Sequence, residues 1–173
     1  MRPTAATPSS TPSGGTLPRL VRAGVLTGVV DGLFASAVSI GFQHSTVERL
    51  FQGIAATVVG PPAFSGGAGT AGIGLLMHFG VAFGWSAVFL FLVAPSPRTR
   101  AVLATPYGRL KVASLYGPAV WLVMSLMVIP LLLQRPPRLG ALWWIELVGH
   151  IPFVGLPIVA SIAGAAPRRA GTG

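Results

Sequence analysis

Long apolar runs separated by short polar stretches dominate the sequence. Four of these runs extend over about residues 20–42, 69–93, 112–133 and 141–164. Each is near or above the roughly 20 residues that an α-helix needs to cross the ~30 Å hydrocarbon core of a bilayer. The pattern therefore predicts an all-α membrane protein with four transmembrane helices.

A shorter amphipathic helix is expected between the first two spans, over about residues 46–59. Ser45 and Glu48 have the spacing of a capping box at its start, and Gly60 followed by two prolines ends it. Its apolar side chains recur at helical spacing, at Val47, Leu50, Phe51, Ile54 and Val58. About 14 residues are too few to cross a bilayer. We therefore expect an interfacial or re-entrant helix on the outer side, with a surface helix packed over the bundle as the alternative.

Basic residues predict how the four spans are oriented. With the N-terminus inside, the inner segments hold Arg2, Arg19, Arg22, Arg98, Arg100, Arg109, Lys111, Arg168 and Arg169. The outer segments then hold Arg49, Arg135 and Arg138. Because lysine and arginine concentrate in cytoplasmic loops, we expect both termini in the cytoplasm. Trp143 and Trp144, at the outer end of the fourth segment, agree with an aromatic belt at that interface.

Composition agrees with a membrane protein and excludes several other classes. Hydrophobic residues make up 52% of the 173 residues and charged residues 9%, and the mean hydropathy is +0.74. No cysteine is present, which excludes disulfides and thiolate metal centres. The net charge of +9 is not gathered on a basic face with stacking aromatics, so the expected partner is the lipid bilayer and not nucleic acid. The sequence contains no nucleophile triad, phosphate loop or dinucleotide motif, and an enzyme is not expected.

The two ends of the chain differ from its apolar middle. Residues 1–18 are rich in Ser, Thr, Pro and Gly, so we expect this tail to be disordered or to be ordered by a partner. A signal peptide is the weaker alternative. Residues 166–173 form a basic C-terminal tail. The transmembrane domain is therefore expected over residues 19–165.

Four ionisable side chains lie inside the apolar segments: Asp31, His78, Glu146 and His150. A charged side chain at the centre of a bilayer costs on the order of 2.5–3.5 kcal/mol by insertion scales, so each group needs compensation. At a rise of about 1.5 Å per residue, Asp31, His78 and His150 come near the midplane. Glu146 falls in the outer leaflet, one helical turn from His150. These residues are the candidate polar intramembrane cluster.

Glycine repeats predict two helix-packing faces. They comprise Gly24, Gly28 and Gly32 in the first segment and Gly80 and Gly84 in the second. Small residues spaced by four let helix backbones approach closely. Asp31 follows Gly24 by two helical turns and lies on nearly the same side. We therefore expect Asp31 to face another helix rather than lipid, with packing inside the chain favoured over homodimerisation.

Three interpretations of the polar cluster stay open. In the first, the four groups hydrogen-bond to one another and to nearby backbone, and so hold helices together. In the second, they form a proton or cation pathway, with a histidine that titrates near neutral pH beside Asp31 or Glu146. In the third, His78 and His150 ligate a haem, a pigment or a metal ion between helices.

A resemblance to known proteins extends over about residues 19–163. It is carried by five stretches: GVLTGVVDGLFA, FQGIAATVVG, LMHFGVAFGWSAVF, YGPAVWLVMSLMVIPL and ELVGHIPFVGLPI. Together they resemble small bacterial inner-membrane proteins of unknown function, and the closing pattern IPL…PP…ELVGH is similar to the YagU family. The four ionisable residues named above would occupy the recurrent polar positions of that group. Ser125 departs from the pattern, which leads us to expect Asn there. The resemblance implies a four-helix architecture in the bacterial inner membrane, and it carries no activity.

The leading functional hypothesis is therefore a non-catalytic one. The protein would be a structural or accessory subunit, without a bound cofactor, that packs into a larger membrane complex such as a respiratory or photosynthetic one. The first alternative is a small proton or ion conductor, or a transport-related protein, that uses the Asp/His cluster. The second is haem, pigment or metal binding by the two intramembrane histidines.

Overall fold

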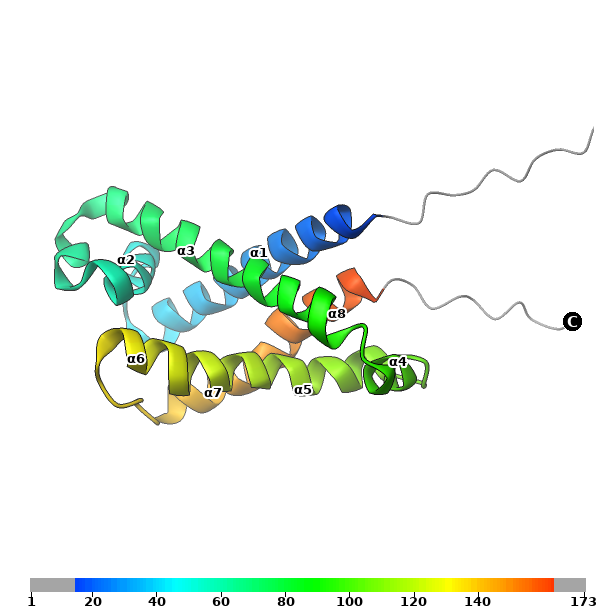
Figure 1. Ribbon diagram of the computed structural model, residues 1–173. Coiled ribbons are helices and arrows are strands. Elements are labelled where there is room, and N and C mark those ends of the chain that lie inside the picture. The colour runs from blue at the N-terminus through cyan, green and yellow to red at the C-terminus, as the bar shows by residue number, and fades with distance from the viewer. Residues whose placement is uncertain (1–14, 164–173) are drawn as a thin grey trace, which may run out of the picture.

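Four long helices form the frame of the protein, and the structure, a computed structural model, describes residues 15–163 (Figure 1). They extend over Thr16–Gln43, Gly67–Val93, Gly108–Leu133 and Ala141–Ile162. Each is long and apolar enough to cross a membrane. The predicted helical fold class and the four membrane-spanning lengths are confirmed. The first and third helices begin earlier than the sequence predicted, because their first turns are less apolar than their middles.

Shorter elements interrupt and connect these four helices. In chain order the elements are α1 (Thr16–Gln43), α2 (Val47–Val59), η1 (Pro61–Ser65), α3 (Gly67–Val88), η2 (Phe89–Val93), α4 (Pro97–Leu103), α5 (Gly108–Val123), η3 (Met124–Val128), α6 (Ile129–Leu133), α7 (Ala141–His150), η4 (Ile151–Gly155) and α8 (Leu156–Ile162). η1 is a 3₁₀-helix, whereas η2, η3 and η4 are π-helical. The second, third and fourth spans therefore each combine α-helix with π-helix.

The bundle has two distinct ends. The start of α1, the end of α8 and the whole of α4 lie at one end, which we call the α4 end (Figure 1). The helix α2 and the loop 134–140 lie at the opposite end, which we call the α2 end (Figure 1). Near the α4 end, the guanidinium group of Arg22 donates a hydrogen bond to the carbonyl of Ser161 and so ties α1 to α8.

The predicted tails lie almost entirely outside the described residues. This holds for residues 1–14 of the N-terminal tail and for the whole of the C-terminal tail 166–173. The last residues of the predicted N-terminal tail, from Thr16 onward, belong to α1.

The helix α2 is present where the sequence predicted a short helix, but its cap differs. Thr46 and not Ser45 is the N-cap, since its Oγ1 accepts a hydrogen bond from the backbone N–H of Arg49 at 3.1 Å. The predicted capping box is therefore wrong. Glu48 instead accepts a hydrogen bond from Nε2 of Gln52 at 3.3 Å, one turn further along α2.

Backbone contact at a glycine holds α2 against α3. A Cβ atom added to Gly74 of α3 would overlap the carbonyl oxygen of Phe51 in α2. The buried side chain of Gln52 completes the contact, because its Nε2 also donates to the carbonyl of Gly67 at 3.2 Å. The two helices therefore meet at backbone distance, which only a residue without a side chain permits.

The glycine face of α1 is filled by aromatic side chains of α3. The ring of Phe83 lies against Gly24. The ring of Phe79 lies against Gly28 in the same way, so a methyl group at either glycine would collide with a ring. This face of α1 thus packs inside the chain. Gly80 and Gly84 of α3 differ, because no atom of the described chain lies within 4 Å of a Cβ placed at either one.

A second backbone contact joins α5 to the fourth span. A Cβ at Gly117 of α5 would overlap the carbonyl oxygen of His150. One turn further along the pair, a Cβ at Gly155 of η4 would overlap the carbonyl oxygen of Ala113. Two glycines on opposite helices therefore bring the two backbones together over a full turn.

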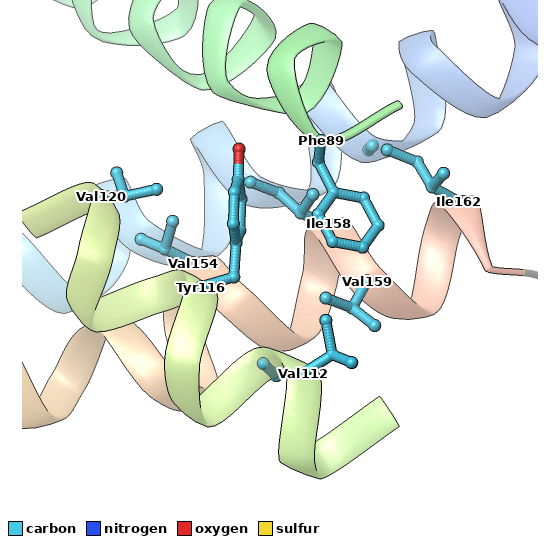
Figure 2. Packing of buried hydrophobic residues seen from close by; sticks show 10 residues of the cluster. Phe89, Val112, Tyr116, Val120, Val154, Ile158, Val159 and Ile162 are labelled. Carbon is cyan, nitrogen blue, oxygen red and sulfur yellow. The ribbon is translucent and has the colours of Figure 1, made fainter. Parts of the chain in front are cut away.

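The apolar core extends from this contact toward the α4 end. Its buried residues are Ala23, Phe89, Val112, Ala113, Tyr116, Val120, Val154, Ile158, Val159 and Ile162. Figure 2 shows Tyr116 rising from α5 toward α3, with Phe89 and Ile158 beside it. The Tyr116 hydroxyl donates a hydrogen bond to the carbonyl of Trp85 at 2.6 Å, so its polar end is satisfied within the core.

The π-helical segments mark places where the regular hydrogen-bond ladder shifts by one residue. Each ends in a backbone hydrogen bond from an N–H to the carbonyl five residues earlier: from Ala94 to Phe89, from Ile129 to Met124 and from Leu156 to Ile151. Pro130 follows η3 and Pro152 lies inside η4, and a proline has no N–H to continue an α-helical ladder. Single π turns often accompany functional sites.

We predict that Gly74→Ala destabilises the protein whereas Gly72→Ala does not. The new methyl group at Gly74 meets the backbone of Phe51, and such overpacking costs about 1–3 kcal/mol. Gly72 lies half a turn away in the same helix with open space around it, and alanine there removes a glycine from a helix interior. Thermal unfolding of both variants in one detergent measures the difference. Equal melting temperatures would contradict the α2–α3 contact.

Candidate functional site

A cavity of about 720 Å³ lies at the α2 end of the bundle, between α2, α6, the loop 134–140 and α7. Its volume is within the range of roughly 300–1,000 Å³ that is usual for ligand pockets. Most of its wall is apolar. The polar groups in its lining include Gln43, Thr57, Ser125, Arg135, Arg138 and Glu146. A largely apolar cavity with a few charged groups is the general form of a binding site.

Glu146 supplies the acidic group of this cavity. It lies in α7, five residues after Ala141, which places it about 8 Å along the helix from its start. Its side chain is 17% exposed. Nδ1 of His150 lies 4.0 Å from one carboxyl oxygen of Glu146. Within residues 15–163 the carboxyl group accepts no hydrogen bond, and Glu146 lines the cavity.

His150 is satisfied by backbone and not by the Glu146 carboxyl group. Its Nδ1 donates a hydrogen bond to the carbonyl oxygen of Glu146 at 2.7 Å. The imidazole packs against the ring of Trp121, with ring centroids 4.8 Å apart. Because the carbonyl of His150 also lies against Gly117, both the ring and the backbone of this residue are fixed by α5.

Two tryptophans and a serine build one wall of the cavity. Nε1 of Trp121 donates to the carbonyl of Trp143 at 3.1 Å. Nε1 of Trp143 donates in turn to Oγ of Ser125 at 3.0 Å. Both hydrogen bonds join the third span to the fourth. They hold the two indole rings in fixed positions beside Glu146, and all four residues line the cavity.

Asp31 approaches the same region from α1. It lies three residues before Phe34, whose ring contacts the fourth span at Gly149. In the described part of the chain its carboxyl group, like that of Glu146, accepts no hydrogen bond. One turn earlier, the buried hydroxyl of Thr27 also has no hydrogen-bond partner among these residues. Two carboxyl groups without hydrogen-bonded partners therefore occur in one region of the bundle.

Phe34, three residues after Asp31, connects α1 to the fourth span. Its ring stacks on that of Phe153, with centroids 4.4 Å apart and an interplanar angle of 18°. The same ring lies against Gly149, where a side chain would collide with it. This contact brings α1 and its carboxyl group to the fourth span.

His78 belongs to a different interface. Its Nε2 donates a hydrogen bond to the carbonyl oxygen of Gly28 at 2.9 Å, which joins α3 to α1. The imidazole makes edge contacts with the rings of Phe51 and Phe79, at centroid distances of 6.0 and 5.8 Å. Gly32 lies beneath it. His78 is therefore a packed, hydrogen-bonded residue, and it does not line the cavity.

The structure groups the four candidate residues differently from the depth estimate. Similar depth suggested Asp31, His78 and His150 as neighbours, yet none of the three pairs makes an ion pair or hydrogen bond within residues 15–163. Glu146, predicted to lie one helical turn from His150 in the outer leaflet, has a carboxyl oxygen 4.0 Å from Nδ1 of His150. Among the described residues, no group of three or more His, Asp and Glu side chains is placed to hold a metal ion.

Comparison with known proteins adds no further assignment. No family model matches the chain, and neither a curated protein nor a solved structure matches it.

Sequence reasoning missed several residues of the cavity. In the sequence analysis, Arg135 and Arg138 served only as outer charges for the orientation of the spans. The Pro-Pro pair between them is a signal that could have been used, because it holds the two arginines at a constant spacing. Trp121 was not considered. Ser125 was noted as a departure from an expected Asn, and its hydroxyl still provides the acceptor for Trp143.

We predict that Ser125→Ala destabilises the protein while Ser114→Ala has little effect. Without the Ser125 hydroxyl, the buried Trp143 N–H loses its acceptor, which costs about 1–3 kcal/mol. Ser114 lies on the same span, but it is half-buried and bonds only within its own helix, to the carbonyls of Leu110 and Lys111. Thermal unfolding followed by tryptophan fluorescence measures both changes. If Ser114→Ala lowered the melting temperature as much as Ser125→Ala, the result would argue against the interhelical hydrogen bond.

Proposed function

We propose that the protein is a multi-pass protein of the bacterial inner membrane that binds a cationic solute at Glu146. The observation that supports this proposal is the state of that carboxyl group. It lies inside a span, faces a cavity, and accepts no hydrogen bond from residues 15–163. An ionisable group at such a depth is costly unless a proton or a cation compensates it. A solute cation and a proton would therefore compete for the carboxyl group.

The neighbouring side chains favour an organic ammonium ion among cations. The indole rings of Trp121 and Trp143 line the cavity with Glu146. Ammonium groups bind over aromatic faces through the ring quadrupole, and tryptophan binds them best. A hydrated metal ion would call for several oxygen ligands, and the described residues here offer a single carboxylate with aromatic walls. We therefore expect an alkylated amine to bind at the carboxylate beside the indoles.

The distribution of charge supports an orientation with both termini in the cytoplasm. The α4 end carries Arg19, Arg22, Arg98, Arg100, Arg109 and Lys111, whereas the α2 end carries Arg49, Arg135 and Arg138. By the positive-inside rule the α4 end is cytoplasmic. The cavity would then open to the outer side, where α2 would lie at the membrane interface. Solute would enter from outside the cytoplasm.

An accessory role in a larger membrane complex stays a prediction with less support. It was motivated by the glycine face of the first span, and Phe79 and Phe83 of α3 occupy that face at Gly28 and Gly24. The face is therefore not free for another subunit. A haem or pigment held by both histidines is also less favoured. His78 donates to a backbone carbonyl of α1, and His150 donates to a backbone carbonyl of its own helix, so one nitrogen of each ring is already bonded.

We predict that Glu146→Gln weakens binding of a quaternary ammonium ion at least tenfold. Glutamine keeps the size of the side chain and removes its charge, and a tenfold loss corresponds to about 1.4 kcal/mol. Binding of choline to purified protein can be followed by the fluorescence of the two cavity tryptophans. The affinity of the native protein should also fall as pH is lowered, because the proton competes for the same carboxyl group.

Glu48→Gln is the matched control for this experiment. Glu48 is the acidic residue outside the spans, it is exposed on α2, and it does not line the cavity. Its replacement should leave choline affinity unchanged. Equal affinity in the native and Glu146→Gln proteins, or the same loss at Glu48, would remove the proposal.

A further inference from the structure

Two guanidinium groups line the same cavity as Glu146. Arg135 and Arg138 lie in the exposed loop that joins α6 to α7, and both contribute to the cavity wall. Neither makes an ion pair with a carboxylate in the part of the chain that the structure describes. The cavity therefore has positive charge at its mouth and negative charge deeper along α7.

The loop holds these two arginines at the mouth. Gln134 ends α6 in the left-handed conformation with φ 51°, which turns the chain away from the helix axis. Pro136 and Pro137 then restrict the backbone between the two arginines, because each proline ring fixes φ. Arginine stems are long and apolar, so the guanidinium heads can reach from the loop into the cavity.

The cavity contains a carboxylate and two guanidinium groups that do not pair with one another, so a ligand with both a positive and a negative group fits it. Direct pairing of Glu146 with an arginine would be favourable in a low-dielectric site, yet no such ion pair is formed. A ligand with a cationic and an anionic group would meet both sets of charges at once. The two arginines favour phosphate as the anionic group, because guanidinium forks bind phosphate oxygens in pairs.

We propose that the ligand of this cavity is a zwitterion that carries an ammonium group and a phosphate. The ammonium group lies at Glu146 on the cavity wall that Trp121 and Trp143 help to form, and the phosphate is bound by Arg135 and Arg138. This inference rests on the proposed function, since it adds a second group to the same ligand. Free phosphocholine and the headgroup of a phospholipid share this chemistry, and the apolar remainder of the wall accommodates the acyl chains in the second case.

The test compares choline with phosphocholine on purified protein in a maltoside detergent. The native protein should bind phosphocholine at least tenfold more tightly than choline. The double variant Arg135→Gln/Arg138→Gln should bind both molecules with the affinity that the native protein has for choline. Glu146→Gln should lose both. Arg49→Gln is the control, because Arg49 lies at the same end of the bundle over the ring of Phe64 and does not line the cavity.

Each outcome separates this inference from the proposed function. If choline binds in a Glu146-dependent manner and phosphocholine binds no better, the zwitterion is wrong and the cation site stands. The zwitterion is also wrong if the double arginine variant still binds phosphocholine more tightly than choline, or if Arg49→Gln loses this difference equally. If neither molecule binds through Glu146, both proposals fall. A well-folded state of each variant is checked by its melting temperature.

Bilayer discs distinguish the two sources of the zwitterion. In discs of phosphatidylcholine, a lipid ligand would compete with added phosphocholine and lower its apparent affinity relative to discs of phosphatidylglycerol. That competition should weaken in the double arginine variant, because the phosphate of the lipid headgroup is no longer bound. An equal affinity in both discs identifies a soluble zwitterion as the ligand. Binding that is insensitive to the arginines in both discs overturns the inference.

Discussion

The structure depends on the backbone contact between α5 and the fourth span. Gly117 lies under the carbonyl of His150, and Gly155 lies against the carbonyl of Ala113, so the two helices meet without intervening side chains. On the other side of the fourth span, Gly149 receives the ring of Phe34 from α1. A helix held on two sides in this way has little freedom to rotate. Its remaining face carries Glu146 toward the cavity, and the orientation of that carboxyl group is therefore a consequence of glycine packing.

The same contacts explain why the ionisable residues divide into two kinds. His78 and His150 each donate one ring nitrogen to a backbone carbonyl, at 2.9 and 2.7 Å, and both rings are packed against aromatic neighbours. The His78 hydrogen bond joins α3 to α1, whereas His150 bonds within its own helix and contacts α5 through its ring. The carboxyl groups of Asp31 and Glu146 have no such partner in residues 15–163. Burial without a partner is costly, so functional interest moves from the histidines to the carboxyl groups.

Much of the architecture could be predicted from the sequence, whereas the neighbours of each polar residue could not. Span length and the apolar stripe of α2 depend on local periodicity, which a single sequence contains. Depth in the membrane is also local, but two residues at one depth can lie on different interfaces, as His78 and His150 do. The spacing of glycines likewise does not determine what each glycine contacts. Gly24 and Gly28 meet aromatic rings, Gly80 and Gly84 meet nothing in the described chain, and Gly117 makes a backbone contact without any repeat around it.

The position of the core bears on the choice between the proposed binding site and a continuous conducting path. An ion that crossed the protein from the cavity would have to pass the part of the bundle between Glu146 and the α4 end. That part holds the buried cluster around Phe89, Tyr116 and Ile158, where Figure 2 shows apolar side chains from several helices in contact. The hydroxyl of Tyr116 is already bonded to the carbonyl of Trp85. An apolar, close-packed layer of this kind excludes water and ions. None of these core residues lines the cavity, and passage of solute toward the α4 end would need them to separate.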